Sequence, residues 1–154
     1  MRPTRWLLPV AILTHLACGE APQGPPFKPV ADVKELMKTV IDPSADTLWE
    51  ASGAIVTATA TIERTPSNDE EWAKVRNAAV VLAESGNLLM MLPRAKDKDL
   101  WMKRSQELVD TGAEAWKAAE AHDAERLFTV GGDVYDACTH CHQDYMDAIK
   151  NANP

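Results

Sequence analysis

The chain has 154 residues, which is enough for one domain of ordinary size. Aspartate and glutamate outnumber lysine and arginine by 23 to 16, and the formal net charge is −7. This balance excludes a nucleic-acid-binding protein, because phosphate recognition needs clustered basic residues. Glycine is scarce, whereas alanine, leucine, glutamate and lysine are common. These residues favour helices, so the composition predicts a helical protein.

The N-terminal segment has the pattern of an export signal. Arg2 and Arg5 precede an apolar stretch over residues 6–16, which is too short to span a bilayer as a permanent anchor. We therefore expect residues 1–17 to be a signal peptide and the protein to leave the cytoplasm.

Ala17 and Cys18 follow this apolar stretch, and a small residue before a cysteine at this place resembles the lipidation site of a bacterial lipoprotein. Ordinary signal cleavage within residues 17–21 is the alternative. Residues 18–28 are rich in proline and glycine, so we expect an extended tether between a membrane anchor and the domain.

The first helix is expected to start at Val30 and to end near Gly53, which supplies a left-handed C-terminal residue. Asp42-Pro43 interrupts its regular pattern, because proline has no N–H and clashes with the preceding turn, so we expect one helix with a kink at this point. Asp42 is expected to cap a restarted helix with Pro43 in its first position. The apolar stripe consists of Val30, Val33, Met37, Val40, Ile41, Ala45, Leu48 and Trp49.

A non-helical segment and then three further helices are expected after the first helix. Residues 54–65 alternate β-branched and apolar residues, which indicates an extended loop or a short hairpin. Residues 67–70 form a capping box that opens a second helix, which continues until Pro93. A third helix is expected over about Asp97–Ala121, and a fourth from Asp123.

The predicted fold is all-α, with residues 29–150 as an antiparallel four-helix bundle whose C-terminal helix carries the cysteine-containing motif of residues 138–142. The apolar stripe of the second helix consists of Trp72, Val75, Ala79, Leu82, Gly86, Leu89 and Met90. That of the third helix consists of Trp101, Leu108, Gly112, Trp116 and Ala119. That of the fourth helix consists of Leu127, Phe128, Gly131, Val134, Tyr135, Cys138, Cys141, His142, Tyr145 and Ile149.

The chemistry lies in the C-x-x-C-H sequence of residues 138–142. On a helix, Cys138 and Cys141 share one face, from which each thiol can add to a vinyl group of a haem. His142 remains on that face and can bind the iron. The sequence therefore predicts one covalently attached haem c.

Three other uses of this motif are less favourable. A disulfide across so short a helical loop has poor geometry. A thioredoxin-like redox pair would follow a strand, and a structural zinc would need four ligands. The sequence has no second cysteine pair for zinc, and His122 would join His142 only by coincidence of packing.

Residues 132–145 resemble the final helix of the class II cytochromes c, which include cytochrome c-prime and its low-spin, methionine-ligated relatives. The resemblance implies a distal haem face on the first helix and a methionine followed by lysine as sixth ligand. Met37 before Lys38 matches that position. Val33 replaces an arginine frequent in the family, and Met146 replaces a basic residue common in cytochrome c-prime.

The resemblance predicts a periplasmic electron carrier with His142 and Met37 on a low-spin iron and without enzymatic activity. The alternative is a five-coordinate, cytochrome c-prime-like protein that binds or sequesters NO or CO. We expect a redox protein as partner, no nucleic acid, and membrane attachment only through Cys18; a homodimer fits the family.

Several residues near this site allow more than one reading. Met37 also fits ordinary core packing, and Met90 and Met91 are rival ligands.

Tyr135 and Tyr145 flank the motif, so their rings are expected to pack beside the porphyrin. His122 and His140 are expected to lie off the haem face, and the tryptophans to fill the core. Gly131-Gly132 indicates either a close neighbouring element or a loose helix start.

Overall fold

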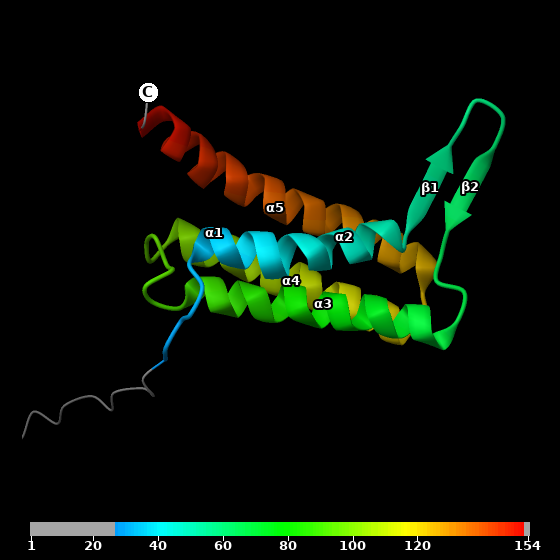
Figure 1. Ribbon diagram of the computed structural model, residues 1–154, viewed down its shortest axis with the longest axis horizontal. Helices are drawn as coiled ribbons and strands as arrows, with labels where there is room; N and C mark the ends of the chain where they lie inside the picture. Colours follow the sequence, from blue (N-terminus) through cyan, green and yellow to red (C-terminus); the bar gives the residue numbers. More distant parts are fainter. Residues whose placement is uncertain (1–26, 153–154) are drawn as a thin grey trace, which may run out of the picture.

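The computed structural model describes the backbone of residues 27–152, and its regular structure is almost entirely helical (Figure 1). The predictions for residues 1–26, including the signal peptide at 1–17, the lipid on Cys18 and most of the tether at 18–28, lie outside the described residues. Within the described part, no helix combines the length and the apolar character needed to cross a bilayer.

Helices pack on one another throughout the protein, and one small hairpin projects beyond them (Figure 1). The first helical segment is continuous but has three parts, and it is followed by two strands and three long helices. In chain order the elements are α1 (Val33–Leu36), the π-helix η1 (Met37–Ile41), α2 (Asp42–Glu50), β1 (Gly53–Val56), β2 (Thr61–Arg64), α3 (Asp69–Met90), α4 (Leu100–Glu120) and α5 (Ala124–Ala152).

The first helical segment begins three residues later than predicted. Asp32 is its N-cap, and the Asp32 carboxylate accepts a hydrogen bond from the Glu35 N–H at 2.8 Å. Val30 precedes this cap and is fully exposed, so its assignment to the apolar stripe is wrong. The capping carboxylate, which sequence reasoning overlooked, determines the start.

The helical segment continues through Pro43 as one run, as predicted, but the predicted N-cap at Asp42 is wrong. Asp42 is helical (φ −57°, ψ −49°) rather than an extended N-cap, and its N–H donates to the carbonyl of Met37, five residues earlier. A proline inside a regular α-helix costs about 3 kcal/mol. The π turn carries the chain past Pro43 without ending the helix.

Residues 53–64 form the predicted hairpin, with Gly53 paired to Arg64 and Val56 to Thr61 in antiparallel register. Gly53 has a φ of +114°, which glycine adopts without a side-chain clash. It opens β1 and does not end the preceding helix, because that helix stops at Glu50. Most side chains of the hairpin are exposed.

The N-cap of α3 lies one residue after the predicted one. The Asn68 side chain accepts from the Glu71 N–H at 3.0 Å, and the Glu71 carboxylate accepts from the Ser67 N–H at 2.7 Å. Asn68 therefore supplies the N-cap half of a capping box instead of Ser67, but the Glu71 carboxylate reaches back to Ser67 and not to the Asn68 N–H, so the bonding is not reciprocal. Asparagine caps a helix as well as serine does.

The boundaries of α4 and α5 agree with the predictions to within a few residues. Asp123 precedes α5 and accepts from the Arg126 N–H at 3.0 Å, as an N-cap does. Most stripe positions are buried, but three predicted core aromatics are not. Trp116, Phe128 and Tyr135 are 41%, 62% and 60% exposed, because they lie at the margins of their stripes.

Helices α3 and α4 approach one another most closely at two glycines. A Cβ on Gly86 would lie 2.6 Å from the Ser105 carbonyl oxygen, and a Cβ on Gly112 would lie 2.6 Å from the Ala83 nitrogen. Each glycine therefore lets its helix lie directly on the backbone of the other. Gly131 is less constrained: its carbonyl accepts from the Trp49 indole N–H at 2.9 Å, but an added Cβ would lie 3.6 Å from the Trp49 ring, an ordinary contact distance. A neighbouring element therefore lies beside Gly131 without requiring glycine at that position.

Replacing Gly86 by alanine should destabilise the protein by about 1–3 kcal/mol, because α3 and α4 must separate to admit the methyl group. Gly132→Ala is the matched control. No heavy atom lies within 4 Å of its added Cβ, so the better helix propensity of alanine should add up to about 1 kcal/mol. Urea unfolding of both variants measures the difference. Equal stabilities would contradict the close approach at Gly86.

Candidate cofactor pocket

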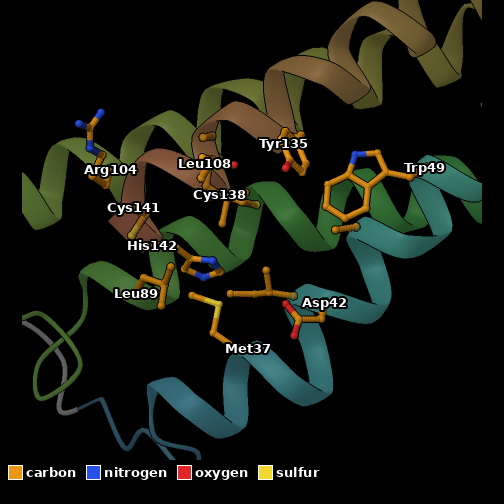
Figure 2. Close-up of a pocket in the computed structure, with 14 residues that line it drawn as sticks. Met37, Asp42, Trp49, Leu89, Arg104, Leu108, Tyr135, Cys138, Cys141 and His142 are labelled. Carbon is orange, nitrogen blue, oxygen red and sulfur yellow. The ribbon is translucent and has the colours of Figure 1, made fainter. Parts of the chain in front are cut away.

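A single cavity gathers most of the predicted site residues. It encloses about 270 Å³, and the empty space reaches about 840 Å³ when its solvent-open part is included. The first helical segment, α3, α4 and α5 contribute its walls (Figure 2). The lining residues are Met37, Ile41, Asp42, Ala45, Trp49, Leu89, Arg104, Leu108, Tyr135, Ala137, Cys138, Thr139, Cys141 and His142.

Helix α5 forms the wall that carries the motif. Cys138, Cys141 and His142 all line the cavity, because a spacing of three and four residues returns to one helical face. Both cysteines are half-buried. His142 is exposed at the mouth, but its imidazole points inward, toward the opposite wall (Figure 2).

Met37 lies on that opposite wall, at the start of η1. Its thioether and the His142 imidazole face one another across the cavity (Figure 2). Met90 and Met91 lie at the end of α3 and are not among the lining residues. Among the described methionines, Met37 is therefore the one that reaches this cavity.

The two thiols are not bonded to one another and favour the protonated form. Burial, with smaller contributions from Cys141 and Asp42, raises the pKa of Cys138 to about 11. Burial also raises the pKa of Cys141. A thioredoxin-like pair needs a lowered pKa, so this environment opposes that use of the motif.

Tyr135 and Tyr145 occupy different environments. Tyr135 lines the cavity and packs edge-on against Trp49, with ring centroids 6.1 Å apart. Tyr145 packs edge-on against Trp101 at 4.9 Å and donates its hydroxyl hydrogen bond to Asp97. Tyr145 is not among the lining residues, so its predicted place beside a porphyrin gains no support from the cavity.

His122 and His140 both lie off the cavity, as expected. His122 is exposed and stacks on Trp72 with ring centroids 4.9 Å apart. His140 is half-exposed, and its Nδ1 lies 3.8 Å from the Glu107 carboxylate. Within the described residues, no three histidine, cysteine, aspartate or glutamate side chains gather as a metal site would require.

Sequence reasoning missed two charged residues of the cavity, Asp42 and Arg104. Asp42 was assigned to a helix cap, which concealed any other role. Arg104 was overlooked because it is charged, although it lies three residues after Trp101 and four before Leu108 on the buried stripe of α4. A cation at an otherwise apolar stripe position was the available signal.

Arg104 connects α4 to the segment that follows the motif. Its Nε donates to Asp144 at 2.7 Å, and its Nη1 donates to Glu107 at 2.9 Å. These hydrogen bonds raise the pKa of Arg104. The Tyr145 hydroxyl adds a second connection, to Asp97 just before α4. Together these contacts hold α5 on α4 immediately beside His142.

The donor set and the lining residues of the cavity have the chemistry that a haem site needs. Two half-buried thiols and an imidazole lie on one wall, and a thioether lies on the facing wall. Soft thioether sulfur and imidazole nitrogen are both ligands of haem iron. The rest of the lining is mainly apolar, as a porphyrin face requires, with Ile41, Ala45, Leu89, Leu108 and Ala137 contributing.

Comparisons of the chain with protein-family models, with curated proteins and with solved structures find no match.

Removing the Tyr145 hydroxyl should make the protein less sensitive to acid. Its hydrogen bond is the main reason why the pKa of Asp97 lies below the usual 3.8. A lowered folded-state pKa contributes stability above the unfolded-state pKa, and this contribution is lost as pH falls through the folded-state value. Tyr145→Phe should therefore lower the melting temperature at pH 7, and the difference from wild type should shrink below about pH 4.

Thermal unfolding between pH 7 and pH 2.5 measures this effect. Asp97→Asn is the matched variant, because it removes the carboxylate and keeps the tyrosine. A difference between wild type and Tyr145→Phe that stays constant over this pH range would contradict the assignment to Asp97.

Proposed function

We propose that the chain is a c-type cytochrome that carries electrons through one covalently bound haem. Cys138 and Cys141 would form the two thioether bonds, and His142 and Met37 would be the axial ligands. The observation that carries the proposal is that Met37 and His142 face one another across a cavity that both cysteines also line. These four side chains are the donor set that such a cytochrome needs.

The bound haem would supply reversible one-electron chemistry at its iron. The protein residues determine how that chemistry is used. If His142 and Met37 both bound the iron, no position would remain for a gas or a substrate, which would favour electron transfer over gas binding or catalysis. Ile41, Leu89 and Leu108 would keep water from the haem faces, and a thioether ligand and low polarity both raise the reduction potential.

We also propose that the helices form an antiparallel four-helix bundle of the class II cytochrome c type. The first helical segment packs on α3, α3 packs on α4, and α4 packs on α5. Helices that follow one another through short connections usually pack as antiparallel neighbours. The C-terminal place of the C-x-x-C-H motif on α5 agrees with this family.

The cellular location, the membrane anchor and the partners are proposed from the sequence. An export signal at residues 1–17 would deliver the chain to the bacterial periplasm, where a lipid on Cys18 would anchor it to the membrane. Its partner would be a redox protein of that compartment, and two copies would form a homodimer. No enzymatic activity is proposed.

The proposal predicts a low-spin optical spectrum for protein exported in the presence of haem-attachment machinery. The oxidised form should show the weak near-infrared band of methionine–iron ligation, and the reduced form should bind carbon monoxide slowly. Met37→Ala should abolish the band, produce a high-spin ferric spectrum and accelerate carbon monoxide binding at least tenfold, because a coordination position opens.

Met90→Ala is the matched control, because this methionine ends α3 outside the cavity. It should keep the wild-type spectrum. A high-spin wild-type protein that binds carbon monoxide rapidly would replace the carrier with the five-coordinate, gas-binding alternative. Loss of the band in Met90→Ala but not in Met37→Ala would move the axial ligand to α3.

A further inference from the structure

The π-helical turn η1 lies directly at the residue proposed as the distal ligand. Met37 begins this turn, and its carbonyl accepts from the Asp42 N–H five residues later. An α-helix would pair that carbonyl with the N–H of Ile41, four residues later. The turn therefore contains one extra residue between α1 and α2.

Burial along the segment reflects this extra residue. Leu36 and Ile41 are both buried although they are five residues apart, whereas Ile41, Ala45 and Leu48 follow the ordinary spacing of four and three. In an uninterrupted α-helix, residues five apart point roughly 140° away from each other. Only the π turn allows Leu36 and Ile41 to enter the same core.

The same turn changes the direction of Met37. One residue of an α-helix subtends about 100°, so the extra residue rotates the preceding segment by up to that angle relative to α2. Without it, Met37 would lie one regular turn before Ile41, on the side away from Asp42 and Trp49. With it, Leu36 takes the core position and Met37 swings toward the cavity side, where Asp42 and Trp49 also lie.

Pro43 gives a physical reason for the turn. Its ring would clash with the carbonyl of Thr39 in a regular α-helix, and it has no N–H to offer that carbonyl. Two hydroxyls flank the disturbance and bind carbonyls four residues earlier: Thr39 Oγ1 donates to Glu35 at 2.7 Å, and Ser44 Oγ donates to Val40 at 2.7 Å. Such bonds favour helix distortion.

We propose that Pro43 is a positioning residue that maintains the π turn and thereby aims the Met37 thioether across the cavity at His142. This inference rests on the proposed function, because Met37 matters only as a ligand. Pro43 itself does not line the cavity, so it acts through backbone geometry.

The test is Pro43→Ala in the haem-loaded protein. Alanine supplies the missing N–H and removes the ring, so the segment can return to a regular α-helix. Met37 should then rotate into the core and Leu36 out of it. We expect the variant to lose most of the methionine–iron band and the strongly upfield methyl resonance of Met37 in the reduced protein. Hydrogen-bond couplings by NMR should show the Asp42 N–H leaving the Met37 carbonyl.

A second variant shows whether Pro43→Ala loses the methionine–iron band because Met37 points elsewhere or because the helix is generally disrupted. Deleting Thr39 in the Pro43→Ala background removes the extra residue, so Leu36 again lies four residues before Ile41. A regular α-helix then directs Leu36 to the core and Met37 to the cavity side. The double variant should regain the methionine–iron band while containing no π turn. A structural defect at position 43 would not be repaired by a deletion.

The outcomes distinguish the two proposals. A wild-type protein without the methionine–iron band would overturn the ligand assignment and this inference together. A wild-type protein with the band, combined with a Pro43→Ala variant that keeps both band and π turn, would overturn only the role of Pro43. Loss of the π turn with an unchanged band would show that the turn does not aim Met37, and would overturn the inference as well.

Discussion

The close packing of α3 on α4 fixes the geometry of the cavity, because each wall is attached to a different helix of this pair. The first helical segment, with Met37, lies on α3, whereas α5, with the motif, lies on α4. Gly86 and Gly112 bring the two backbones together, and the Trp101 indole donates across the pair to the Leu89 carbonyl at 2.8 Å. The separation between the two walls is thus determined mainly by this helix pair.

The first helical segment and α5, which form the two opposite walls, contact one another at one end of the cavity. The Trp49 indole donates to the Gly131 carbonyl, and the Trp49 ring meets Tyr135 at the edge of the cavity. Beyond that contact α5 diverges from α1 and α2 (Figure 1), and polar contacts from Arg104 and Asp97 hold it on α4. The resulting wedge is closed by aromatic residues at one end and open near His142, as a cofactor with one solvent-facing edge would require.

The sequence was most informative where the relevant spacing is local. The positions of Cys138, Cys141 and His142 on one face follow from helical periodicity alone, and the helix boundaries follow from caps and prolines to within a few residues. The π turn could not be predicted, because Pro43 suggests an interruption equally well, and the choice depends on which residue enters the core. Met37 was predicted as a ligand through family resemblance. Arg104 was missed because its partner Asp144 reaches it only through the packing of α5 on α4, whereas its other partner, Glu107, lies on α4 itself.

The proposed function depends on a porphyrin bonded to the two cysteines of α5. This bond can be tested by mass spectrometry of the peptide containing residues 138–142, taken from protein exported with haem-attachment machinery and then denatured. The peptide should carry the mass of one haem and keep its red colour after acid–acetone extraction. A colourless peptide of unmodified mass, with thiols that are free or joined in a disulfide, would show that no haem is attached there.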